Sequence, residues 1–150
     1  MGESPVPPSS GDSIRVSVVE IDSTECGSAD ALAQSFGRPV FEPAWWPEDI
    51  LPVTYFLDQS PSGDKYRIGS ARRDGTPIVL IGGAVRSGRL ANGNWSRPRE
   101  LEAWQGLIRT AGAHVHAVVQ HEQQTIHLIG YASEGEVLRA LNSLRRVAAE

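Results

Sequence analysis

The clearest structural signal in the chain lies in residues 113–136, AHVHAVVQHEQQTIHLIGYASEGE. Apolar residues alternate with other residues in 113–119 and again in 125–131, which is the period of a β-strand. The segment HEQQ, residues 121–124 between these runs, leaves room for a two-residue turn. We therefore predict an antiparallel hairpin in which Val118 pairs with His127.

This register assigns each hairpin residue to one face, because side chains alternate sides along a strand. The face expected to join the core carries Val115, Ala117, Val119, Ile126 and Leu128. The opposite face carries His114, His116, Val118, His127, Ile129 and Tyr131. The assignment depends on the turn, since a three-residue loop would move His127 to the other face.

A helix is expected directly after the hairpin. Ser133 and Glu136 have the spacing of a capping box, in which each side chain bonds the backbone N–H of the other residue. An apolar stripe continues the helical pattern to residue 148 and consists of Val137, Leu138, Leu141, Leu144 and Ala148. Arg145 and Arg146 would then lie at the negative end of the helix dipole.

Three further strands are expected upstream of the hairpin, at residues 53–57, 65–72 and 76–81. The second and third of these flank Asp74-Gly75, which is the sequence of a type I′ turn. The third strand is apolar on both faces, which is typical of a central strand covered on each side.

Two segments between these strands and the hairpin are less regular. Residues 86–94, RSGRLANGN, are expected to form a mobile loop. Residues 97–109 place Leu101, Trp104 and Ile108 on one helical face, which favours a helix, with a strand as the alternative because Gly106 interrupts the pattern.

The N-terminal third combines an expected tail, a strand, a helix and a loop. Residues 1–12 are rich in proline, serine and glycine and are expected to be disordered. Residues 14–21, IRVSVVEI, alternate like a strand that residues 22–24 break. Residues 28–36 predict a short helix with a serine cap at its start and a glycine at its end. Four prolines in residues 39–52 predict a loop, which is ordered because it also carries three large aromatic residues.

Together these elements predict an α+β fold. We expect one domain over residues 13–150, built on an antiparallel sheet of about five to six strands. A short N-terminal helix and the capped C-terminal helix would pack on this sheet. A chain of 150 residues is about one domain and is long enough to bury a core.

Composition excludes several classes of protein. Hydrophobic residues make up 40% and charged residues 21%, near the globular average. No run approaches the ~18 apolar residues of a membrane helix, and the first residues lack the parts of a secretory signal. We therefore expect a cytoplasmic protein, with an extracytoplasmic domain of a longer chain as the alternative. Cys26 is the single cysteine, so neither a disulfide framework nor a cysteine zinc site is expected. No cofactor is predicted.

Two segments resemble a known kind of bacterial domain. They are ALAQSFGRPVFEPAWWPEDILP at 31–52 and HAVVQHEQQTIHLIGYASEGEVLRALNSL at 116–144. The matching positions are Pro39-Val40, Pro43, Trp46-Pro47, Gly130 and Ser143-Leu144. The pattern resembles a family of uncharacterised bacterial domains, a domain of unknown function found behind anti-sigma-factor or lipoprotein segments. The resemblance implies a curved sheet similar to that of lipoprotein carriers. The chain departs from it at Pro52-Val53, where the family has Gly-Tyr, and no catalytic residue is implied.

Charge is distributed unevenly along the chain. Residues 1–64 hold eleven carboxylates and two arginines, a net charge of −9, whereas residues 65–99 carry a net charge of +7. Attraction between the two parts within the fold is the simpler interpretation. The alternative is an anion or nucleic-acid surface in the arginine-rich segment, formed by Arg67, Arg72, Arg73, Arg86 and Arg89. Nucleic acid is the less favoured partner.

Aromatic residues supply the first candidate site. A ligand cleft beside the open sheet face could be lined by Trp45, Trp46, Tyr55, Trp95, Trp104 and Tyr131. The other interpretation is that the tryptophans seal one end of the sheet. The chain has no nucleophile elbow, phosphate loop or Cys–His pattern. The sequence therefore favours a non-enzymatic domain that binds a protein or a small apolar ligand.

Three histidines supply the second candidate site. His114, His116 and His127 on one sheet face resemble an open zinc site, which would allow hydrolysis. Against this interpretation, no aspartate, glutamate or cysteine shares that hairpin face, and Val118 and Ile129 cannot orient an imidazole ring. We therefore predict that these histidines hold no metal and titrate near their ordinary pKa of ~6.5.

Overall fold

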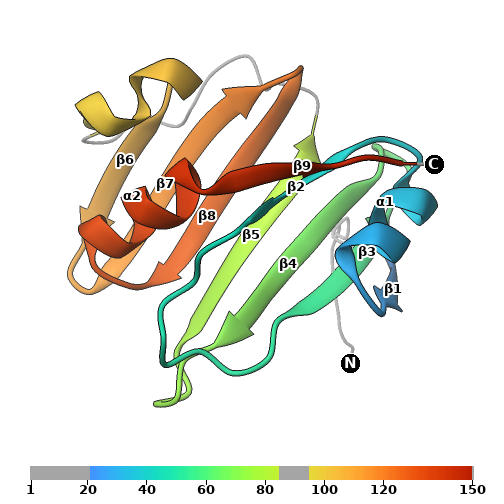
Figure 1. The fold of residues 1–150 in the computed structure, drawn as a ribbon, viewed down its shortest axis with the longest axis horizontal. Coiled ribbons are helices and arrows are strands. Elements are labelled where there is room, and N and C mark those ends of the chain that lie inside the picture. Colours follow the sequence, from blue (N-terminus) through green and yellow to red (C-terminus); the bar gives the residue numbers. More distant parts are fainter. Residues whose placement is uncertain (1–20, 85–94, 150) are drawn as a thin grey trace, which may run out of the picture.

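The main element of the fold is a seven-stranded antiparallel sheet (Figure 1). The computed structural model describes residues 21–84 and 95–149. In spatial order, the strands are β1 (Asp22–Cys26), β3 (Thr54–Gln59), β4 (Lys65–Ala71), β5 (Pro77–Ala84), β8 (Gln124–Tyr131), β7 (His114–His121) and β6 (Leu107–Ala111). Neighbouring strands are antiparallel throughout.

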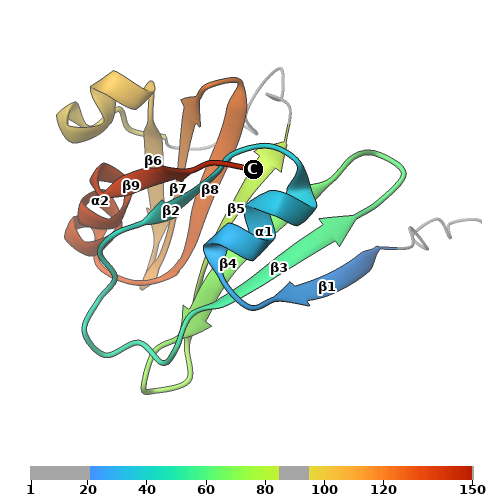
Figure 2. The same cartoon turned by 45° about the vertical axis from the view of Figure 1, so that its right-hand side comes forward.

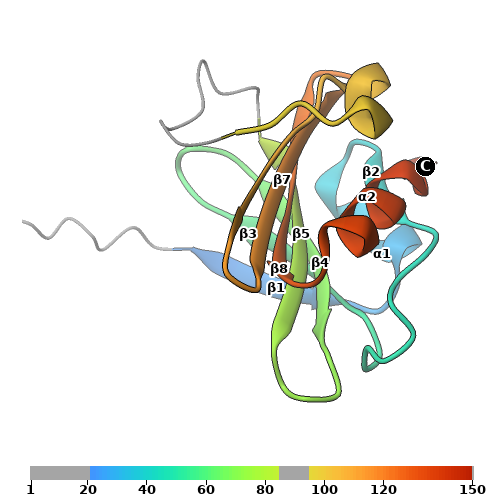
Figure 3. The ribbon, with the colours of Figure 1, turned by 90° about the vertical axis from the view of Figure 1, so that its left-hand side faces the viewer.

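A second layer covers one face of this sheet, which we call the covered face. The layer contains the helices α1 (Ala29–Phe36) and α2 (Glu134–Asn142), the 3-10 helix η3 (Arg99–Trp104), and a small sheet of β2 (Val40–Pro43) and β9 (Leu144–Val147). Figure 2 shows α1 across β3 and β4, and Figure 3 shows α1, α2 and β2 on the same side of the large sheet. We call the opposite side the outer face. The α+β prediction is confirmed, with more strands than the five to six expected.

The core lies between the two layers. The hairpin residues predicted to face it are at most 2% exposed, so the predicted register is correct. Glu122 and Gln123 form the two-residue turn, both with positive φ. The core is completed by Leu32 and Phe36 of α1, Val137 and Leu141 of α2, and Tyr66, Ile68, Ile78 and Leu80 of the sheet.

Both predicted helix starts are confirmed by their caps. The Ser28 side chain accepts a hydrogen bond from the Ala31 N–H at 3.1 Å, and Gly37 ends α1 with a φ of 79°. At α2, the Ser133 side chain accepts from the Glu136 N–H, and the Glu136 carboxylate accepts from the Ser133 N–H. These bonds satisfy backbone donors that a helix start leaves without partners.

The C-terminal helix is shorter than predicted. It ends at Asn142, and residues 144–147 form β9, which pairs with β2. Ser143 marks the change, because its hydroxyl accepts a hydrogen bond from the Trp45 N–H and its carbonyl accepts from the Ala44 N–H. Pairing with a strand about a hundred residues earlier overrides the local helical pattern, as tertiary context often does.

The N-terminal predictions also need correction. Residues 22–24, which were expected to break a strand, form the first part of the strand β1, because they pair with the end of β3. The predicted loop at 39–52 contains β2, whose proline, Pro43, stands at its last position, where a missing N–H is tolerated. The tail at 1–12, the strand predicted at 14–21 and the loop predicted at 86–94 lie outside the described residues, apart from Ile21.

Two further segments differ from the sequence prediction. Asp74-Gly75 does not form a type I′ turn, since Gly75 has a positive φ of 92° and Asp74 does not. The Asp74 carboxylate instead accepts hydrogen bonds from the N–H and hydroxyl of Thr76, which favours a wider hairpin turn. The segment at 97–109 is neither helix nor strand throughout. It forms η3 and then, after Gly106, the edge strand β6.

Candidate functional site on the outer face

The outer face of the sheet gathers half-buried apolar side chains. They are Phe56 of β3, Val79 and Ile81 of β5, Ile129 of β8 and Leu107 of β6. Because side chains alternate along strands, these residues point away from the layer that holds the helices. In residues 21–84 and 95–149 no second layer covers this side of the sheet, and apolar groups on such a face are typical of a contact surface.

Gly69 leaves a shallow hollow in this face. A pocket of about 380 Å³ lies over β3 to β5, and its lining includes Phe56, Arg67, Gly69 and Val79. A Cβ atom on Gly69 would lie 2.7 Å from the Ile78 carbonyl oxygen and 2.9 Å from a methyl carbon of Val79. The glycine therefore permits close packing of β4 on β5 and leaves the hollow free of a side chain at that point.

A row of aromatic rings and imidazoles crosses the same face over β6, β7 and β8. The Arg109 guanidinium lies 4.8 Å from the centre of the Trp95 ring, and Trp95 meets His116 edge to face at 5.2 Å. The His116 Nε2 and His127 Nδ1 atoms lie 2.9 Å apart, at hydrogen-bonding distance. His114 packs edge to face on Tyr131, with ring centres 5.3 Å apart. We call these six residues the imidazole row.

The central imidazoles of the row are neutral at pH 7. Burial, followed by the charges of the neighbouring His127, Arg109 and His114, lowers the pKa of His116 to about 4. Burial, followed by the charge of Lys65, also lowers the pKa of His127. The expectation of ordinary titration near 6.5 was therefore wrong for these two residues. Because both rings are neutral, one donates its N–H to the other.

The three histidines share the outer face, as predicted, but only two of them meet. His116 contacts His127, whereas the His114 ring packs on Tyr131. Within residues 21–84 and 95–149, no three histidine, cysteine, aspartate or glutamate side chains are arranged to hold a metal ion. The arrangement offers at most two imidazole ligands, fewer than a catalytic zinc site uses.

The charge of the outer face is one-sided over five adjacent strands. The strands β4, β5, β8, β7 and β6 contain no aspartate or glutamate. Their cations, Lys65, Arg67 and Arg109, occupy positions that all face outward. Arg67 is bound to Asp58 of β3, with Nη2 and Oδ1 3.1 Å apart. Among the described carboxylates, none forms a salt bridge with Lys65 or Arg109.

The structure divides the six predicted aromatic residues between the two faces. Trp95 and Tyr131 belong to the imidazole row. The other four pack against the core on the covered face: Trp45, Trp46, Tyr55 and Trp104. There, Trp45 lies under the Arg139 guanidinium and Trp104 packs on His121. The sheet separates these groups, so they do not line one common cleft.

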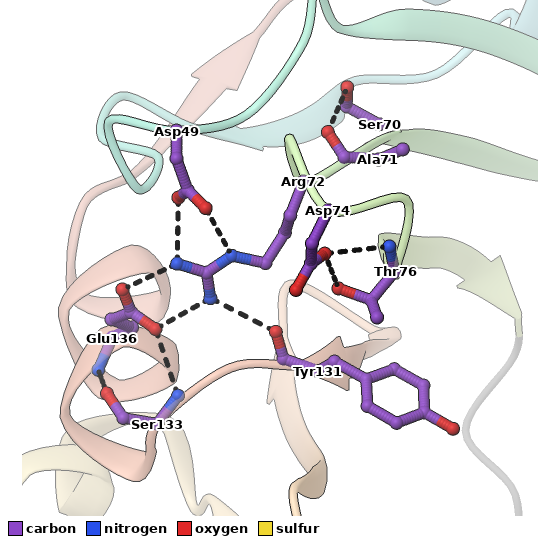
Figure 4. Close-up of polar contacts among 9 residues, drawn as sticks. All are labelled: Asp49, Ser70, Ala71, Arg72, Asp74, Thr76, Tyr131, Ser133 and Glu136. Carbon is purple, nitrogen blue, oxygen red and sulfur yellow. Dashed lines mark hydrogen bonds and ion pairs between the residues drawn. The ribbon is translucent and has the colours of Figure 1, made fainter.

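Arg72, one of the arginines of the predicted anion surface, is instead bound within the protein by two carboxylates (Figure 4). Arg72 donates Nε and Nη2 to Asp49 at 3.0 and 2.7 Å, and Nη1 and Nη2 to Glu136 at 2.8 and 3.1 Å. Nη1 also donates to the Tyr131 carbonyl at 3.0 Å. These bonds fasten the β4–β5 turn to α2 and to the proline-rich segment. Since the guanidinium is fully engaged, we assign Arg72 a structural role.

The other predicted arginines are dispersed. Arg67 is paired with Asp58, and Arg73 is exposed on the β4–β5 turn. Arg86 and Arg89 lie outside the described residues. Sequence reasoning missed Arg109, which the structure brings to the imidazole row. Its position opposite His116 could have been found only by recognising residues 107–111 as a strand.

Comparison with known proteins found no matching family model, no matching curated protein and no matching solved structure. The resemblance to bacterial domains behind anti-sigma-factor or lipoprotein segments therefore stays a prediction. No helix in the described parts of the chain has the length and apolar character needed to cross a membrane.

Proposed function

We propose that the protein is a non-enzymatic binding domain whose contact surface is the outer face of its large sheet. The observation that carries this proposal is the set of half-buried apolar side chains on β3 to β8, on the side opposite the helices. Natural proteins keep large apolar patches for contact with a partner or ligand. The partner would be a protein or a small apolar molecule.

The imidazole row supports binding over catalysis. His116 and His127 are hydrogen-bonded to each other, and among the described residues neither ring is bonded to a nucleophile or an orienting carboxylate. A ring pair of this kind supplies flat, partly apolar area with one polar edge. Such area suits contact with a partner's side chains.

A neutral apolar dye tests this function without involving charge. Nile red fluorescence should rise on titration with the full chain, and amide chemical shifts should change on β4, β5, β8 and β7. Ile129→Ser should weaken dye binding severalfold, whereas Ile21→Ser should not, because exposed Ile21 precedes the edge strand β1, four strands away from the β8 strand that holds Ile129. A dye that bound both variants like the wild type, or that shifted only the helix amides, would refute the proposal.

The histidine metal site remains a second candidate because of one contact. The two facing nitrogens of His116 and His127 are close enough for a single ion to replace the proton between them. Zinc titration followed by histidine ring NMR tests this alternative. Tight one-to-one binding with shifts at His114, His116 and His127 would favour it, and our expectation is weak binding without coordinated shifts of all three rings.

A further inference from the structure

We propose that the outer face binds an acidic, leucine- or aromatic-containing segment of a protein partner. This inference rests on the proposed function and adds the charge of the partner. The five adjacent strands β4, β5, β8, β7 and β6 contain no carboxylate, and their three cations all face outward. An approaching acidic group therefore meets attraction from these strands and no repulsion from them.

Two of these cations form no salt bridge with any described residue, and they lie on either side of the apolar part of the outer face. Lys65 lies on β4 and Arg109 on β6, the two outermost of the five strands. Between them lie Ile81, Ile129 and the imidazole pair. A peptide segment that crosses the strands could bury its apolar side chains on these residues and pair its carboxylates with both cations.

Arg109 is already positioned for such a contact. Its guanidinium lies over the Trp95 ring, and this contact already restricts the Arg109 side chain. The conformational entropy that Arg109 would lose on binding a partner is therefore smaller. A guanidinium held by its flat face keeps its N–H edge available for a carboxylate. The neutral state of His116 and His127 leaves Arg109 and Lys65 as the charges that an acidic partner would recognise at pH 7.

The same charges disfavour other occupants. Two copies of the chain packed outer face to outer face would bring like charges together, which is costly at an interface. A nucleic acid gains affinity from many phosphate contacts, and the five described strands of this surface supply three cations, of which Arg67 is already paired with Asp58. The partner that fits is therefore one with few carboxylates and an apolar part.

Three labelled peptides test the inference on the full chain. In the first, glutamate and leucine alternate; in the second, lysine replaces glutamate; in the third, serine replaces leucine. Fluorescence anisotropy should show binding of the first peptide at least about tenfold tighter than that of the other two, with a loss of affinity at high salt.

Matched variants locate the binding. The double variant Lys65→Ala/Arg109→Ala should weaken binding of the glutamate–leucine peptide by about tenfold. The control Arg73→Ala/Arg146→Ala changes the net charge equally, at exposed positions away from this face, and should change binding less than about twofold. Melting curves would verify that both variants are folded.

Three results would overturn the inference: equal binding of the glutamate and lysine peptides, equal loss in both double variants, or binding to phosphatidylserine vesicles without binding to the peptide. If Nile red binds the outer face and the peptides show no charge preference, the proposed function stands and the acidic partner is wrong. If neither the dye nor any peptide binds, both are wrong.

Discussion

Replacing Tyr66 with phenylalanine should destabilise the protein by detaching β2 from the large sheet. The Tyr66 side chain is fully buried on β4. Its hydroxyl accepts a hydrogen bond from the Phe41 N–H at 3.0 Å and donates to the Gln124 side-chain oxygen at 2.8 Å. The Gln124 amide in turn donates to the Pro39 carbonyl at 2.7 Å. This chain of bonds links β4, β8 and the strand β2 of the covering layer.

The expected size of the effect follows from the two groups left without a partner. Tyr66→Phe keeps the ring but leaves the Phe41 N–H and the Gln124 oxygen unsatisfied, each at a cost of about 1–3 kcal/mol when buried. We expect a loss of about 2–4 kcal/mol in the free energy of unfolding. For a chain of this size the melting temperature would fall by roughly 5–15 °C.

The pH dependence offers an independent measurement. Burial raises the pKa of Tyr66 above its ordinary value of ~10. A raised pKa in the folded state means that the stability gained from the neutral phenol is complete below ~pH 10 and is lost as the pH rises further. The wild type should therefore weaken in alkali, and Tyr66→Phe should remove part of that decline.

Urea unfolding followed by circular dichroism, at pH 7 and at alkaline pH, measures both effects. Tyr55→Phe is the control, because among the described residues the Tyr55 hydroxyl is bonded to Glu42 alone, and Arg145 also binds that carboxylate. Burial raises the pKa of Tyr55 to about 12, so this control also tests the alkaline effect. We expect it to cost about 1 kcal/mol. The reasoning fails if Tyr66→Phe is as stable as the wild type or no less stable than Tyr55→Phe.

Other substitutions test the remaining contacts by the same unfolding measurements. Ser133→Ala should cost about 1 kcal/mol through the lost cap, and Leu141→Ala about 2–5 kcal/mol through lost burial; neutral results would show that α2 is not packed as described. Arg72→Met should lower the melting temperature at neutral pH. It should also flatten the decline in acid, because hydrogen bonds from Arg72 lower the pKa values of Asp49 and Glu136 and so give stability that is lost as carboxylates protonate. The lowered pKa of His116 means that the unfolded chain is protonated at this residue before the folded one, so stability should fall as the pH drops from 6.5 to about 4. His116→Gln should reduce this fall, and an unchanged pH profile would refute the assignment.

The sequence predicted those elements whose signals are local. The β7–β8 hairpin has alternation on both strands and a short turn, so its register followed from residues 113–131 alone. The capping box at Ser133 is equally local, since its two side chains are three residues apart. In both cases the interactions that define the element lie within a few residues of one another.

The sequence could not predict elements defined by distant partners. Residues 144–147 continue a helical pattern and become β9 only because β2 is available to pair. In β1, the first four residues are exposed, so no alternation marks the strand. The shared face of His116 and His127 was predicted because both residues lie within one hairpin, whereas Arg109 reaches the imidazole row from an edge strand whose sequence resembles a helix. Long-range pairing therefore determined both the missed strands and the missed site residue.

The pairing of β2 with β9 also bears on the order in which the chain is made. Glu42 and Arg145, which form an ion pair across these strands, are 103 positions apart. At ~5–20 residues per second of synthesis, β2 would wait about 5–20 s for its partner strand. During that interval its backbone groups are open to pairing with another chain. A nascent chain that stalls before residue 144 would therefore carry an unpaired strand, and its tendency to associate should disappear once β9 is made.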